Sequence, residues 1–233
     1  MKLNRGQDEA IKHGNGPCMV LAPPGSGKTL IVTERTRYLI EESGVRPDQI
    51  LVITFTRYAA REMKERIARQ VGEQRARYLW MGTFHSVFSR ILRAEAQHVG
   101  FTSQFTIYDS ADSKSLLRSI IKEMGLDEKT YKPGVVQARI SNAKNHLVTP
   151  TGYAANKEAY EGDMAAKMPA IRDIYTRYWE RCRQAGAMDF DDLLVYTYIL
   201  FRDFPDVLAR YRDQFRYVLV DEYQDTNYAQ HSI

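Results

Sequence analysis

The stretch that most constrains the fold of this chain is residues 22–29, with the sequence APPGSGKT, which follow an apolar run at residues 18–21. A strand, a glycine-containing turn and a helix N-terminus surround a phosphate with backbone N–H groups and the positive end of a helix dipole. The pattern predicts a phosphate loop in which Lys28 reaches the β- and γ-phosphates and the Thr29 hydroxyl binds Mg²⁺. Because Ala22 stands where the general pattern has glycine, a glycine-rich turn with a solvated lysine is the alternative.

Two acidic residues late in the chain complete the predicted site. Asp221 and Glu222 come directly after the apolar run at residues 217–220. Charge at the mouth of a buried strand is costly unless a cation lies there, so we expect Asp221 to hold Mg²⁺ opposite Thr29. Glu222 can then orient and deprotonate a water that attacks the γ-phosphate. The alternative is an acidic turn that caps a following helix. It accounts for the acidic residue at Asp225 but poorly for two acidic residues at the end of a buried strand.

The composition sets broad limits. A chain of 233 residues, 44% of them hydrophobic, can bury one large core or two modest ones. The net charge of +4 does not by itself indicate a nucleic-acid partner, but residues 57–93 contain nine basic and three acidic side chains. Such an excess is typical either of a surface that attracts a polyanion or of a solvated helix face.

The cysteines and the apolar runs indicate a compartment. Cys18 and Cys182 lie far apart in the sequence and are expected to be reduced thiols. No stretch resembles a signal peptide, and no apolar run approaches the roughly 20 residues that span a bilayer. We therefore expect a cytoplasmic protein without membrane contact.

The order of apolar and helical patterns predicts an α/β fold with a parallel sheet. Predicted strands are residues 18–21, 50–55, 78–82 and 217–220, and predicted helices of this part are residues 8–13, 29–42, 57–70 and about 83–96. From about residue 101 to 211 helical periodicity dominates, which predicts an inserted helical subdomain. Its expected helices are residues 110–124, 133–145, 168–184, 189–204 and 205–215, with a break at residues 150–152.

Two further features are local. Asn4 can cap the first helix with Gln7 as its capping-box partner, while the Gln7 amide could instead pair with the edge of an adenine. Residues 54–56 and 83–86 follow two predicted strands, and the carboxyl ends of parallel strands share one edge of a sheet. These two segments are therefore candidates for one binding face.

Together these segments resemble the superfamily 1 DNA helicases of the UvrD/Rep/PcrA type, in order and over nearly the whole chain. The segments that carry the resemblance are residues 3–7 (Q motif), 22–29 (motif I, the Walker A loop), 54–60 (motif Ia), 82–86 (the next DNA-binding segment), 188–194 (the run before motif II) and 220–226 (motif II). Two departures stand out: Arg57-Tyr58 replaces the usual Asn-Lys, and Pro23-Pro24 replaces the usual Gly-Ala.

The resemblance implies a P-loop NTPase fold, RecA-like, with an incomplete parallel sheet. Domain 1A, which binds ATP, would comprise residues 1–83 and 214–233, and an all-helical domain 1B would comprise residues 84–213. The chain would then be the N-terminal piece of a longer protein whose C-terminal helicase domains act in cis. By itself it would bind Mg²⁺-ATP weakly, hydrolyse it barely and unwind no DNA.

The implied activity is ATP-driven 3′-to-5′ translocation on single-stranded DNA in repair or replication. The cofactors would be ATP and Mg²⁺, and the partners would be single-stranded and partly duplex DNA together with repair proteins. A helicase-nuclease subunit of the AddA or RecB type remains an alternative within the resemblance. Outside it, the alternatives are a small kinase with a helical lid and a non-catalytic module that binds DNA or protein.

The resemblance also assigns residues to roles. Nucleotide binding falls to Gln7, Pro24, Gly25, Ser26, Gly27, Lys28 and Thr29; metal binding to Thr29 and Asp221; catalysis to Lys28, Glu222 and Gln224; and DNA binding to Thr54, Phe55, Thr56, Arg57, His85 and Ser86. Stacking of a base on Phe55 would be worth about 1–3 kcal/mol, and sheet-edge packing is the alternative for this ring. Trp80 and Phe84 are expected in the core.

Overall fold

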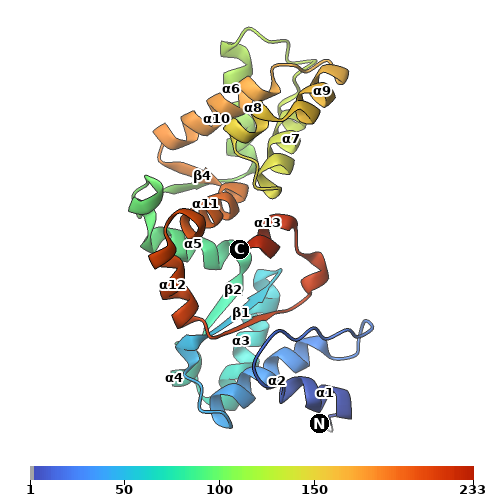
Figure 1. The fold of residues 1–233 in the computed structure, drawn as a ribbon, viewed down its shortest axis with the longest axis vertical. Helices are drawn as coiled ribbons and strands as arrows, with labels where there is room; N and C mark the ends of the chain where they lie inside the picture. Colours follow the sequence, from blue (N-terminus) through green and yellow to red (C-terminus); the bar gives the residue numbers. More distant parts are fainter. Residues whose placement is uncertain (1–2) are drawn as a thin grey trace. The chain divides into compact units, whose positions relative to one another are not determined.

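The computed structural model describes residues 3–233, which fold as a mixed α/β chain of two compact units (Figure 1). The first unit runs up to Val87 and resumes at Asp206–Thr226, and the second comprises Phe88–Pro205 and Asn227–Ile233. The elements of the first unit are α1 (Arg5–Ile11), α2 (Lys28–Glu41), η1 (Pro47–Gln49), β1 (Ile50–Thr54), α3 (Arg57–Val71), α4 (Glu73–Ala76), β2 (Trp80–Thr83), α12 (Pro205–Gln214), β5 (Tyr217–Val220) and η3 (Tyr223–Asp225). Helix α5 (Phe84–Ala94) begins in the first unit and ends in the second.

The first unit is built on a parallel sheet with strand order β2-β1-β5. In the register, Thr54 lies opposite Thr83, and Ile53 lies opposite Val220. All three strands therefore end at one edge, and the segments that follow them gather there, as the sequence predicted.

Strand β1 is buried along its whole length, as its unbroken apolar sequence predicted. Ile50 and Val52 belong to a core that α2 and α3 complete from one side of the sheet. This core consists of Leu39, Ile40, Ile50, Val52, Met63, Ile67, Val71, Ala76 and Leu79.

The strand predicted at residues 18–21 is wrong. These residues form no regular structure, and Met19 and Leu21 are 71% and 86% exposed. A short apolar run becomes a strand only where a neighbouring strand pairs with its backbone groups, and among the described residues β5 pairs with β1 alone. Val218 on β5 accordingly remains 53% exposed.

A buried arginine holds the chain between α1 and α2. Arg35 donates hydrogen bonds from Nη1 to the carbonyls of Ile11 and His13, each at 2.8 Å, and from Nη2 to that of Gly14 at 3.4 Å. The residues that follow α1 are therefore fixed to α2, which carries the predicted phosphate loop at its N-terminus.

The second unit is mainly helical, but the expectation that it is all-helical is wrong. Its elements are η2 (Ala96–Val99), β3 (Thr106–Tyr108), α6 (Ser110–Glu123), α7 (Pro133–Asn145), α8 (Pro150–Ala155), α9 (Lys157–Ala165), α10 (Ile171–Gln184), β4 (Ala187–Asp189), α11 (Phe190–Asp203) and α13 (Tyr228–Ser232). Strands β3 and β4 pair in parallel, and three residues are too few to produce a periodic signal in the sequence. The break expected at residues 150–152 is instead the start of α8, which Thr149 caps.

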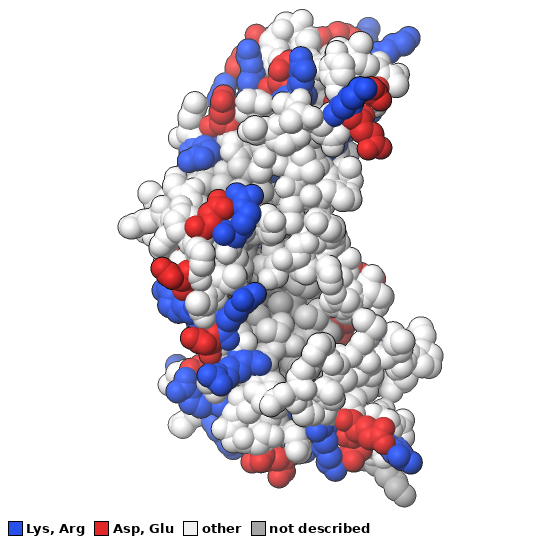
Figure 2. Space-filling view, viewed as in Figure 1, with Lys and Arg blue, Asp and Glu red and all other residues white. Residues whose placement is uncertain are grey.

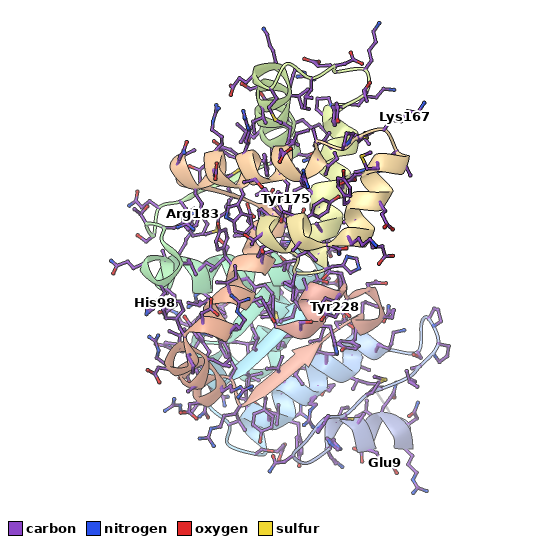
Figure 3. All side chains as sticks on the ribbon, turned by 45° about the horizontal axis from the view of Figure 1, so that its top comes forward. Glu9, His98, Lys167, Tyr175, Arg183 and Tyr228 are labelled. Atoms are coloured by element: carbon purple, nitrogen blue, oxygen red, sulfur yellow. The ribbon has the colours of Figure 1, made fainter. Side chains whose placement is uncertain are left out.

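The core of the second unit is formed mainly by α6, α7 and α10. Leu117, Ile120, Val136, Ile171 and Tyr175 are fully or almost fully buried there. Figure 3 shows Tyr175 among the side chains of these helices, and its hydroxyl donates to the carbonyl of Val148 at 2.8 Å.

The last seven residues differ from the expected domain assignment, because they group with the second unit. Asn227 caps α13, and its Nδ2 donates to the side-chain oxygen of Asn145 on α7. The Tyr228 ring stacks on His146 at a centroid distance of 6.2 Å. These contacts, which no local pattern announces, attach α13 to α7.

Two general expectations concern cysteines and membranes. Both cysteines are free, Cys18 exposed and Cys182 buried, and burial raises the pKa of the Cys182 thiol to about 12. In the described part of the chain, no helix is long and apolar enough to cross a membrane.

Candidate nucleotide and nucleic-acid site

The loop before α2 has the geometry of an anion site. Gly25 and Gly27 have φ angles of 76° and 89°, in the left-handed region that glycine adopts without strain. Gly27 is the N-cap of α2 and offers no side chain to the first helical turn. The N–H groups of that turn have no side-chain acceptor, and the helix dipole adds positive potential at the same place.

One polar group in this loop, the Ser26 hydroxyl, lacks a hydrogen-bond partner among residues 3–233, and Lys28 is bonded only to backbone carbonyls. The N–H of Ser26 donates to the Pro23 carbonyl at 3.3 Å, whereas the Ser26 Oγ is buried and has no hydrogen-bond partner. Lys28 Nζ donates to the carbonyls of Ala22 at 3.3 Å and Pro23 at 3.4 Å. A buried hydroxyl without a partner is costly, so these groups fit a loop that accepts a polar ligand.

Thr29 and Asp221 meet although 192 positions separate them. Thr29 Oγ1 donates to Asp221 Oδ2 at 3.1 Å. The Asp221 N–H donates to the Ile53 carbonyl at 2.9 Å, so this residue extends the ladder between β1 and β5. The structure thus brings together the hydroxyl and the carboxylate that the sequence assigned to a metal ion.

Glu222 has an unusual backbone conformation. Its φ is 52°, a left-handed conformation that costs about 1–3 kcal/mol for a residue other than glycine and is concentrated at functional sites. Its N–H donates to Asp221 Oδ1 at 3.1 Å, and its carboxylate accepts a short hydrogen bond from Gln224 Nε2. Gln224 therefore fixes the position of the Glu222 carboxylate.

The Gln7 amide joins two segments. Its Oε1 accepts from the Asn4 N–H at 3.0 Å, and Asn4 Oδ1 accepts from the Gln7 N–H at 2.8 Å, so the predicted capping box is confirmed. Gln7 Nε2 donates to the Ser26 carbonyl at 3.0 Å, a contact with the phosphate loop that the sequence did not predict. Recognition of adenine by Gln7 stays a prediction.

A magnesium site here would use few protein ligands. Among residues 3–233, no group of three or more His, Cys, Asp or Glu side chains could hold a metal ion. Mg²⁺ commonly binds one or two protein oxygens, with water and phosphate oxygens in the other positions. The Thr29 hydroxyl and the Asp221 carboxylate fit that requirement.

The predicted DNA-binding residues lie at the carboxyl edge of the sheet. Thr54 is buried, and its Oγ1 donates to the Thr56 carbonyl at 3.1 Å. Thr56 is exposed and caps α3 by accepting from the Ala59 N–H at 3.0 Å. Arg57 is exposed at the start of α3.

The remaining residues of this group are partly engaged in packing. The half-buried Phe55 ring contacts Phe84 edge-on, with centroids 5.6 Å apart, and Phe84 is in the core as expected. Ser86 is exposed, and its Oγ donates to the Thr83 carbonyl at 2.9 Å. His85 is half-buried next to it in α5.

A buried charged cluster in the second unit was missed at the sequence level. Lys144 is fully buried, and its Nζ lies 2.7 Å from Asp189 Oδ2 and 2.7 Å from Asp192 Oδ1. The Tyr178 hydroxyl donates to Asp189 Oδ2 at 2.9 Å, and Asp189 caps α11 with Asp192 as its capping-box partner. The acidic run at residues 188–194 was visible in the sequence, but nothing marked Lys144 as its partner.

Electrostatics in this cluster are set by burial and by the ammonium. Burial and the neighbouring Asp189 charge raise the pKa of Asp192 to about 7. Burial opposes ionisation of Asp189 as well, but the Lys144 ammonium lowers the pKa of that carboxyl below its usual value. Burial disfavours the ammonium, and the two carboxylates nevertheless hold the pKa of Lys144 well above its usual value.

Comparison with known proteins gives one consistent family. The sequence model of the UvrD/REP helicase N-terminal domain matches residues 3–233. The chain is 42% identical over 232 residues to the ATP-dependent DNA helicase PcrA of Leuconostoc citreum, an alignment that covers 99% of this chain and 30% of that protein.

Other relatives are similar to the same extent. PcrA of Staphylococcus aureus is 44% identical over 233 residues, covering 99% of this chain and 31% of that protein. The ATP-dependent DNA helicase UvrD1 of Mycobacterium bovis is 45% identical over 230 residues, covering 98% of this chain and 29% of that protein. The chain thus spans about 30% of the length of the relatives it matches.

Proposed function

The chain belongs to the UvrD/REP helicase N-terminal domain family, and from that premise we propose that it is the ATP-binding part of an ATP-dependent DNA helicase. The observation that carries the proposal is the contact between Thr29 Oγ1 and Asp221 Oδ2 at 3.1 Å. It joins the N-terminus of α2, an anion site, to the acidic end of β5. A nucleotide triphosphate with its magnesium ion requires these two features side by side.

Each residue of the site then has a chemical role. The N–H groups at the start of α2 and the Lys28 ammonium hold the β- and γ-phosphates once the ammonium leaves the carbonyls of Ala22 and Pro23. Thr29 and Asp221 would hold a magnesium ion, which would supply positive charge next to the phosphates. Glu222, held by Gln224, orients the attacking water and accepts its proton.

The DNA track and the full activity belong to the same proposal. Single-stranded DNA would run along residues 54–57 and 85–86 at the carboxyl edge of the sheet, and the parent protein would move 3′ to 5′ with ATP and Mg²⁺. The names of the relatives support an ATP-driven DNA helicase. In the proposed parent protein, a C-terminal helicase domain would contribute an arginine to the γ-phosphate across a cleft. Such an arginine is typically worth roughly 10³ to 10⁵ in rate. We therefore expect the 233 residues by themselves to turn over ATP slowly.

Nucleotide binding by this chain tests the proposal directly. We expect Lys28→Ala to weaken binding of Mg²⁺-ATP by about tenfold or more in a calorimetric titration, because a charge-assisted contact to phosphate is lost. Asp221→Asn should weaken binding in the presence of Mg²⁺ and change it little in the presence of EDTA, because its role is through the metal.

The matched control is Lys64→Ala, which removes an exposed charge from α3. It should leave the affinity for Mg²⁺-ATP within about twofold of the parent value. If Lys28→Ala and Lys64→Ala bind the nucleotide equally well, the assignment of this loop to phosphate binding is wrong.

A further inference from the structure

Besides the predicted DNA-binding residues at the carboxyl edge of the sheet, the first unit has an arginine-rich surface at the opposite ends of the strands. Residues 73–78 and 210–216 contain five arginines and two acidic residues. Figure 2 shows Lys and Arg side chains, with some Asp and Glu among them, over α4 and α12, the elements that contain or adjoin these segments. We call this the arginine surface and define it by Arg77, Tyr78, Arg212 and Arg216.

The sheet places Arg77, Tyr78 and Arg216 near one another at its amino edge, and Arg212 precedes them on α12. Arg77 and Tyr78 come just before β2, and Arg216 comes just before β5. Leu51 of β1 lies opposite Trp80, and Ile50 lies opposite Tyr217, so the starts of β2 and β5 flank the start of β1. The Trp80 and Phe215 rings contact each other edge-on, with centroids 4.9 Å apart.

These arginines are available for a ligand. Arg77, Arg212 and Arg216 are exposed, and within the described range 3–233 no hydrogen bond or ion pair joins their guanidinium groups to another residue. In contrast, Arg75 lies 3.6 Å from the Glu41 carboxylate. Tyr78, at the end of the first segment, is 64% exposed.

We propose that the arginine surface docks an acidic segment of a partner protein. Three guanidinium groups without internal partners match carboxylates in bidentate geometry. The surface contains arginine and tyrosine but no lysine, and arginine and tyrosine are the residue types enriched at the energetic centres of protein interfaces. Residues 73–78 and 210–216 likewise contain no lysine.

The position of the surface separates it from the nucleic-acid site. The five residues of β1 span roughly 16 Å at the usual rise per residue. The arginine surface precedes the strands, and the predicted DNA track follows them. A strand of DNA on that track therefore leaves the arginine surface open to a protein.

Peptide binding tests the proposal. The probe is a short fluorescent peptide rich in Asp and Glu with one leucine and one phenylalanine, and its control carries Asn and Gln at the acidic positions. We expect the variant Arg77→Ala/Arg212→Ala/Arg216→Ala to bind the acidic peptide about tenfold more weakly or worse in an anisotropy titration. Hydrogen exchange should show that the bound peptide protects residues 75–80 and 212–218.

The matched control removes the same charge elsewhere. Lys122, Lys129 and Lys132 are exposed in the second unit, and changing all three to Ala should alter peptide affinity by less than about twofold. Equal losses in both triple variants, or no binding of the acidic peptide, would overturn the proposal.

An oligothymidylate distinguishes a nucleic-acid occupant. Its binding should be weakened by Arg57→Ala and be little affected by the arginine triple variant. A selective loss of oligothymidylate binding in the arginine triple variant would overturn the assignment of this surface to a protein partner. The outcome does not depend on nucleotide binding at Lys28.

Discussion

At the scale of single residues, one lysine in the second unit stands out because it has no exposed surface. Lys144 holds the carboxylates of Asp189 and Asp192, and Asp189 also caps α11. A buried charge cluster adds little net stability when complete, but removal of one partner leaves uncompensated charge in a medium of low polarity. Removing one member of the cluster should therefore reduce stability much more than the intact cluster adds to it.

We expect Lys144→Met to lower the free energy of unfolding by about 3–5 kcal/mol, because it leaves two buried carboxylates without their ammonium. Urea denaturation followed by circular dichroism measures this change. Lys114→Met, on the exposed face of α6, is the control and should change stability by no more than about 0.5 kcal/mol. A similarly small loss for Lys144→Met would show that the ion pairs are not structural.

The same cluster predicts a dependence of stability on pH. The folded pKa of Asp192 is about 7, above the ordinary value of 3.8, so the folded state holds this proton more tightly than the unfolded state does. Its contribution is complete below the unfolded pKa and is lost as the pH rises through the folded value. Stability should therefore fall between about pH 4 and pH 7, with a slope of up to about 1.4 kcal/mol per pH unit for one proton.

Urea titrations of the parent chain and of Asp192→Asn over this range test the prediction. Asparagine cannot ionise, so its profile should be flatter than the parental one. Parallel profiles for the two proteins would assign the pH dependence to other groups.

At the scale of elements, strand β2 passes into helix α5 without a linker, since β2 ends at Thr83 and α5 begins at Phe84. The first turn of the helix lies over the strand, and the Ser86 hydroxyl donates to the Thr83 carbonyl at 2.9 Å. A Cβ added at Gly82 would lie only 2.2 Å from Ser86 Oγ. Glycine at this position is required by the close approach of the serine.

We expect Gly82→Ala to destabilise the chain by about 1–3 kcal/mol, because the methyl group displaces the Ser86 side chain. Adding Ser86→Ala should recover a large part of this loss, since the conflicting hydroxyl is gone. A double-mutant cycle in urea gives the coupling between the two sites. Gly162→Ala on α9, where nothing lies within 4 Å of an added Cβ, should instead be neutral or stabilising.

At the scale of the whole molecule, the chain consists of two units with separate cores. All the residues proposed to bind nucleotide and metal are in the first unit, whereas the Lys144 cluster is in the second. A ligand that binds only the folded state stabilises it by an amount set by its concentration relative to Kd, about 2.7 kcal/mol at 100 times Kd. The local effect of a nucleotide should therefore be confined to the first unit.

We expect saturating Mg²⁺-ATP to slow amide hydrogen exchange at residues 25–30 and 219–224 and to leave α7 and α10 nearly unchanged. The reason is that the proposed contacts fix the loop and the end of β5 directly. Asp221→Asn should abolish most of this protection, whereas Lys64→Ala should preserve it. Equal protection of α10 would contradict a local effect.

Features that depend on neighbouring residues follow from the sequence alone. Asn4 caps the first helix as its position predicted, and the apolar run that contains β1 forms a buried strand. Thr56, Asp109 and Asp189 cap later helices in the same local way. Cap hydrogen bonds and the burial of a continuous apolar strand are local, so sequence patterns report them well. The order of the motifs also indicated the family, which the comparisons confirm.

Features that need a partner far away in the sequence depend on the folded chain. Residues 18–21 form no strand despite their apolar sequence. In contrast, β3 and β4 pair as two short parallel strands although their sequences show little strand pattern. The contact of Gln7 with Ser26 and the burial of Lys144 also depend on residues brought together by folding. Residues 22–29 predict a phosphate loop, and the hydrogen bond between Thr29 and Asp221 depends on the fold. A strand or a charged side chain is stabilised by the group opposite it, and the sequence alone does not show which group that is.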